Sequence, residues 1–149
     1  MSFRNKELMN KLITELKEYI FSHNIERTNI SKSKFKGIRD KIFDFKNFED
    51  GTYDLFSNEK IIFDKGYQVS FETFYDSYTN DEYEEISYKM SLMSDNNCYI
   101  GVYRDKPEIS FHFDDYELAN VIGILFNQIS IWDWRKNREI INKFADEYL

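Results

Sequence analysis

The middle of the chain carries apolar residues at alternate positions, the pattern of strands that bury one face. One face would hold apolar side chains such as Val69, Ile100 and Phe111, and the other would hold polar ones such as Gln68 and His112. Such a sheet packs helices on its apolar face and leaves the polar face open to water or to a partner. Turn-forming residues separate the strands, so we expect a meander. The predicted strands are about 59–64, 67–75, 83–93, 98–104 and 108–113.

Helical spacing appears before and after these strands. Leu8, Leu12 and Leu16 form an apolar stripe near the N-terminus, and Leu118 and Ile122 belong to a second stripe after the last strand. The predicted helices are about 4–21, 34–45, 115–129 and 134–147. The sequence therefore predicts a single α+β domain over residues 1–149. In it, a five-stranded antiparallel meander sheet has one face covered by N- and C-terminal helices.

Size and composition agree with one globular domain. The chain has 149 residues, of which 42% are hydrophobic, and it contains one proline. It has no apolar run long enough to span a bilayer, and its first residues lack the apolar block of a secretory signal. A single cysteine, Cys98, excludes a disulfide framework. We therefore expect a cytoplasmic protein that does not bind a membrane.

The charges are unevenly distributed along the chain. The net charge is −7, yet residues 1–46 hold 11 Lys and Arg against 6 Asp and Glu, and the remaining residues hold 9 against 21. An acidic surface repels nucleic acid and speeds association with basic protein surfaces. The expected partner is therefore a basic protein, such as a toxin or a nucleic-acid enzyme.

Carboxylates and tyrosines gather around the predicted loop at 76–82. Carboxylates steer cationic partners, and tyrosine supplies contact area at low entropic cost, so this segment is the candidate partner-binding site. The alternative is a hydrophilic loop that protects a sheet edge. Trp132 and Trp134 either pack in the core or serve as binding anchors. The candidate partner-binding residues are Glu72, Asp76, Tyr78, Asp81, Glu82, Tyr83, Glu84 and Glu85.

No catalytic, metal or cofactor motif stands out. The chain has only two histidines, His23 and His112, and lacks a phosphate-binding glycine loop. A Ser110, His112 and Glu108 grouping on the polar sheet face is conceivable, but strand neighbours two apart lie about 6.6 Å from one another. The basic run 32–41 could meet phosphate or pair with the chain's own acids.

These features favour a small acidic protein, without catalytic activity or cofactor, that neutralises a basic macromolecule. An immunity protein against a bacterial toxin is one example of this class. One alternative is a phage-encoded inhibitor that mimics DNA and blocks a host nucleic-acid enzyme or defence system. Another is an enzyme with a site of carboxylates and His112 on the polar sheet face.

Overall fold

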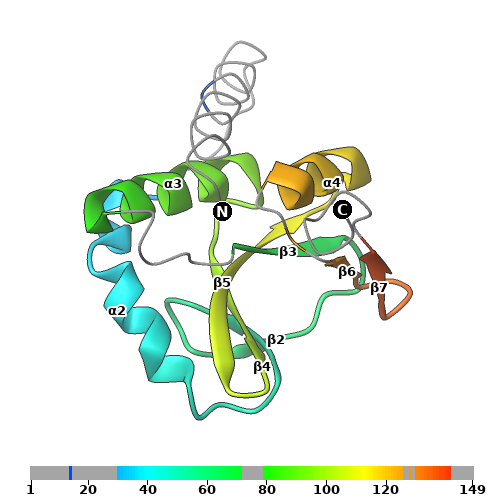
Figure 1. Cartoon of the computed structure of the whole chain (residues 1–149), viewed down its shortest axis with the longest axis horizontal. Helices are drawn as coiled ribbons and strands as arrows, with labels where there is room; N and C mark the ends of the chain where they lie inside the picture. The colour runs from blue at the N-terminus through cyan, green and yellow to red at the C-terminus, as the bar shows by residue number, and fades with distance from the viewer. Residues whose placement is uncertain (1–13, 15–29, 72–78, 126–127, 129, 142–149) are drawn as a thin grey trace.

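The computed structural model describes residues 14, 30–71, 79–125, 128 and 130–141. Within them, seven antiparallel strands form one sheet, which packs with three α-helices in an α+β fold (Figure 1). The strands are β1 Gly51–Asp54, β2 Lys60–Ile61, β3 Tyr67–Phe71, β4 Tyr99–Tyr103, β5 Lys106–Phe113, β6 Ser130–Asp133 and β7 Arg138–Ile141. The α-helices are α2 Ile38–Ile42, α3 Asn80–Met93 and α4 Tyr116–Leu125, and two short 3-10 helices are η1 Lys32–Phe35 and η2 Phe43–Phe45.

The strand order is β2-β1-β4-β5-β3-β6-β7, so the predicted five-stranded meander is wrong. Chain neighbours pair only in the β1–β2, β4–β5 and β6–β7 hairpins, whereas β3 lies between β5 and β6. Lys65 and Gly66, which lie between β2 and β3, therefore do not join two paired strands. Alternation is a local pattern that assigns the faces of a strand, and it carries no information on which strands pair.

The segment predicted as a strand at 83–93 is the helix α3. Its apolar residues alternate, but Tyr83, Ile86, Met90 and Met93 also recur at helical spacing, and these four are buried. Thr79 caps the helix in a reciprocal capping box with Glu82, which satisfies two backbone N–H groups at the helix start. The competition between the two periods is resolved in favour of the helix because its first turn is capped and its apolar stripe faces the core.

Several other predicted elements differ in extent. The strand at 59–64 is reduced to β2, and the expected connection before it contains β1. The helix at 34–45 is divided into η1, α2 and η2, with Gly37 at a φ of 73° between the first two. The helix at 115–129 corresponds to α4, while the helix at 134–147 is wrong over 134–141, where 134–137 form a turn and 138–141 form β7. The helix at 4–21, apart from Thr14, and residues 142–147 lie outside the described residues.

The core lies between the helices and the apolar face of the sheet. Val69, Ile100, Ile109 and Phe111 are each 0% exposed on that face, as alternation predicted. The helix α4 packs against β3, β5 and β6, and α2 contacts both α3 and β5 (Figure 1). The opposite, polar face of the sheet carries the candidate site described below.

Candidate functional site

Cross-strand pairing aligns polar side chains in three rows on the polar face of the sheet. Residues directly opposite one another in a ladder project from the same face, so each row is a set of side-chain neighbours. The first row is Thr52, Gly101 and Glu108; the second is Tyr99, Ser110 and Ser70; the third is His112, Gln68, Trp132 and Glu139. Six of the seven strands contribute to these rows.

A groove of about 570 Å³ lies over these rows. We call it the sheet groove. Its floor is made of small residues, among them Thr52, Ser70, Gly101 and Ser110. A Cβ built on Gly101 would meet no atom closer than 3.8 Å, which is an ordinary contact distance, so a methyl group would fit there without displacing a neighbour. The large side chains that line the groove are Tyr103, Trp132 and Trp134.

The indole of Trp134 is held in place by a buried polar network. The Trp134 Nε1–H donates to Gln68 Oε1 at 3.1 Å, and Gln68 Nε2 donates to Ser110 Oγ at 2.9 Å. The side-chain amide is oriented unambiguously, because an indole can only donate. Trp132 lies edge to face with Trp134, with ring centroids 6.4 Å apart and an interplanar angle of 84°. The two indoles therefore form a fixed corner at the side of the groove.

His112 supports this network from the neighbouring strand β5 and is not among the residues that line the groove. Its Nδ1 lies 3.3 Å from Gln68 Oε1, and because that oxygen is an acceptor, Nδ1 must carry the proton. The imidazole is buried and stacks on Phe63, with centroids 3.7 Å apart. Burial lowers the pKa of His112, although Asp114, with Oδ1 3.7 Å from Nε2, acts in the opposite direction. The neutral imidazole thus holds Gln68 and, through it, Trp134.

The groove is surrounded by more negative than positive charge. Three carboxylates, Asp50, Glu108 and Glu139, line it together with one lysine, Lys106. Asp50 also accepts a hydrogen bond from the Arg104 backbone at 2.9 Å. Glu139 is exposed and forms no ion pair with any residue that the structure describes. The site therefore presents aromatic faces, neutral hydrogen-bonding groups and an excess of negative charge.

Three of the four described carboxylates that were predicted to bind a partner have roles within the fold. Glu82 belongs to the capping box, and Glu84 Oε1 accepts the Gly37 N–H at 2.7 Å. Glu85 pairs with Lys32 and, at 3.4 Å, with Lys89; the hydrogen bond from Lys32 is the main cause of its lowered pKa. Of the described carboxylates in this group, Asp81 alone is exposed.

The aromatic part of that prediction needs a correction. Tyr83 is 0% exposed, and the Arg39 guanidinium lies over its ring, 5.2 Å from the centroid, so Tyr83 is a core residue and not an exposed contact. Glu72, Asp76 and Tyr78 lie outside the described residues. The basic run at 32–41 forms η1 and α2, where Lys34 and Lys41 both lie over the Phe56 ring. These basic side chains therefore contact the chain's own acids and aromatic rings.

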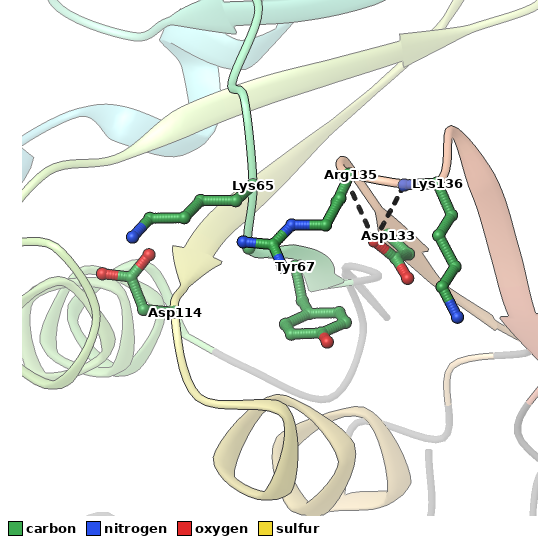
Figure 2. A pocket seen from close by; sticks show the side chains of 7 residues that line it. Lys65, Tyr67, Asp114, Asp133, Arg135 and Lys136 are labelled. Carbon is green, nitrogen blue, oxygen red and sulfur yellow. Dashed lines mark hydrogen bonds between the residues drawn. The ribbon is translucent and has the colours of Figure 1, made fainter.

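A second hollow, of about 350 Å³, lies next to the β6–β7 turn (Figure 2). The Asp133 carboxylate fixes this turn by accepting the backbone N–H groups of Arg135 and Lys136, and the Trp134 N–H donates to Gly66 O. Lys65 reaches the hollow from the neighbouring segment (Figure 2). Three cations therefore line this hollow together with the carboxylates of Asp114 and Asp133. The three cations are Lys65, Arg135 and Lys136, and none forms an ion pair within the described part of the chain.

Comparisons with known proteins do not indicate a function, so a functional assignment depends on the geometry of the site. No protein-family model matches the chain, and no curated protein or solved structure is significantly similar to it. Among the residues that the structure describes, no three His, Cys, Asp or Glu side chains are grouped so that they could hold a metal ion. None of the helices in the same residues is both long and apolar enough to cross a membrane.

Proposed function

We propose that this protein is a small acidic binding protein without catalytic activity, which neutralises a basic macromolecule by docking one of its basic segments in the sheet groove. An immunity protein that inactivates a bacterial toxin has this mode of action. The observation that carries the proposal is the lining of the groove, where three carboxylates and two tryptophans surround an open floor of small residues. A groove of this kind accepts an extended segment whose charge opposes its own.

The rigidity of the groove supports binding in preference to catalysis. Trp134 is fixed by Gln68, which is itself held by Ser110 and His112, so little order has to be imposed on this part of the surface when a partner docks. The His112 ring is buried, stacks on Phe63 and is not among the residues that line the groove, so its imidazole is poorly placed to exchange protons with a bound ligand. Such a surface is suited to recognition through shape and charge.

The charge of the remaining chain supports fast capture. A net charge of −7 produces a field that attracts a basic partner from a distance, and association between opposite fields reaches about 10⁸ M⁻¹s⁻¹ at low salt. The carboxylates of α3 contribute to this field even though they are bound within the fold. In this proposal they steer the partner, and the groove holds it.

The decisive experiment compares three immobilised proteins in extracts of the source organism: wild type, Gly101→Phe and Asp44→Asn. Phenylalanine at position 101 would project into the groove, while Asp44 is an exposed carboxylate of η2 whose loss tests charge alone. We expect a basic protein captured by wild type and by Asp44→Asn but not by Gly101→Phe. Its purified activity should be inhibited by wild type. Equal capture by all three proteins, or a captured enzyme whose activity is unaffected, would contradict the proposal.

A further inference from the structure

We infer that the sheet groove selects arginine over lysine, seating a guanidinium of the partner on Trp132 with its N–H groups directed at Glu139. This inference rests on the proposed function and names the chemical group that the groove recognises. It starts from the β6–β7 register, in which Trp132 and Glu139 are directly opposite one another and project from the polar face. Opposed residues have Cβ atoms about 4.5–5.5 Å apart, so a cation lying on the indole is within reach of the carboxylate.

The two indoles define where that cation can lie. They meet at 84°, and the Trp134 ring is held because its only side-chain donor, Nε1–H, is bound to Gln68. The corner therefore offers aromatic surface without a competing donor on Trp134. A flat group that stacks on an indole face fits such a corner better than a compact, strongly hydrated one.

The carboxylate beside the corner is available. Glu139 is exposed and has no ion pair with the described residues, so a partner's cation would not have to displace a cation of this chain. Arg138 precedes Glu139 in β7 and is paired with Asp133. Its side chain therefore projects from the other face of the sheet. Lys106 lies in the row with Tyr103, on the far side of the Thr52, Gly101 and Glu108 row.

The chemistry of the two basic side chains then predicts the preference. A guanidinium is planar and weakly hydrated, and it donates a fork of N–H groups that matches a carboxylate while it stacks on an aromatic ring. An ammonium satisfies the charge but cannot stack and lose its water as readily. We expect arginine peptides to bind about two- to fivefold more tightly than lysine peptides, a ratio that corresponds to about 0.5–1 kcal/mol, the size of an exposed cation–π contact.

The chain reports on its own groove, because its only two tryptophans both line it. Three blocked peptides alternating glycine with arginine, lysine or citrulline would be titrated against the full chain, with intrinsic fluorescence and calorimetry read in parallel. Citrulline keeps the shape of arginine and removes its charge. We expect arginine to bind more tightly than lysine, and citrulline not to bind. Glu139→Gln should reduce the difference between arginine and lysine, because the stacking on Trp132 remains, whereas Asp44→Asn should leave it intact.

The outcomes separate this inference from the proposed function. If arginine and lysine peptides bind with equal affinity and both change tryptophan fluorescence, the arginine preference is wrong while a cation-binding groove remains. If the ratio of arginine to lysine affinity in Glu139→Gln equals that of the wild type, Glu139 is not the carboxylate that receives the guanidinium. If neither cationic peptide binds by calorimetry, the groove does not accept basic segments, and the proposed function fails together with the inference.

Discussion

The open floor above Gly101 can be tested by filling it in two steps, Gly101→Ala and Gly101→Phe. A Cβ at this position would lie 3.8 Å from Ser70 Oγ, 3.9 Å from Glu108 O and 4.0 Å from Ser110 Oγ, so it fits without displacing a neighbour. The backbone of Gly101 is ordinary strand backbone, paired on both sides to Thr52 and Glu108. Glycine at this position carries an entropic cost of folding, and the backbone geometry does not require it.

The expected magnitude follows from that geometry. Glycine in the interior of a strand is less favourable than alanine by about 0.5–1 kcal/mol, mainly because the unfolded chain loses more freedom on folding. Gly101→Ala should therefore raise the free energy of unfolding by about that amount. With a urea m-value of about 2 kcal/mol/M, the unfolding midpoint would increase by about 0.25–0.5 M. Gly101→Phe should be at least as stable as wild type, because aromatic residues favour strands.

Urea unfolding followed by circular dichroism measures both variants, and peptide titration measures the groove. Stability and binding should respond differently to the two substitutions. Gly101→Phe should keep the fold and lose binding of a cationic peptide, while Gly101→Ala should keep both. A decrease in the stability of Gly101→Ala by more than about 0.5 kcal/mol would refute the reasoning, because it would mean that the space above this glycine is already filled.

Three further predictions concern the elements that position the groove. Burial lowers the pKa of His112 in the folded protein, so below about pH 6.5 the unfolded state binds more protons than the folded state. The free energy of unfolding should therefore fall as the pH decreases from about 6.5. The variant His112→Asn, which keeps a donor toward Gln68, should show a weaker pH dependence in urea unfolding. Gly66→Ala should destabilise the protein by about 2–3 kcal/mol in the same assay, since a Cβ would lie 2.5 Å from the His112 ring at a φ of 92°. Thr79→Ala should cost about 1 kcal/mol through loss of the α3 cap, and Thr79→Ser should restore it; equal midpoints for the two variants would contradict that role.

Sequence reasoning located the faces of the strands better than the strands themselves. Alternation placed Val69 and Phe111 on the buried face and Gln68 and Ser110 on the polar face, and all four are where it predicted. The same rule misread α3, because its apolar residues fit periods of 2 and of 3.6 equally over a short stretch. The Thr79-Asn80-Asp81-Glu82 segment has the form of a capping box and would have favoured the helix.

The groove could not be predicted, because it depends on strand pairing over long sequence separations. Trp132 was recognisable as a potential anchor, yet its position beside Gln68 depends on the pairing of β6 with β3. Gly101 joins the floor because β4 lies between β1 and β5. No local pattern contains these pairings, which are chosen by the packing of the whole core. Without the strand pairings, the sequence shows which residues lie on the polar face but not which of them are neighbours in the groove.

Charge along a sequence likewise does not distinguish carboxylates that fold the protein from those left to bind. Glu82, Glu84 and Glu85 each satisfy a donor of their own chain, and a partner that competed for Glu82 would sacrifice a helix cap worth about 1 kcal/mol. Glu139 has no such commitment within the described residues, and the ring of Trp132 lies beside it. An acid of this second kind can bind a cation without weakening the fold. For this reason the groove, with fewer carboxylates than the α3 region, is the better candidate for the surface that holds a basic partner.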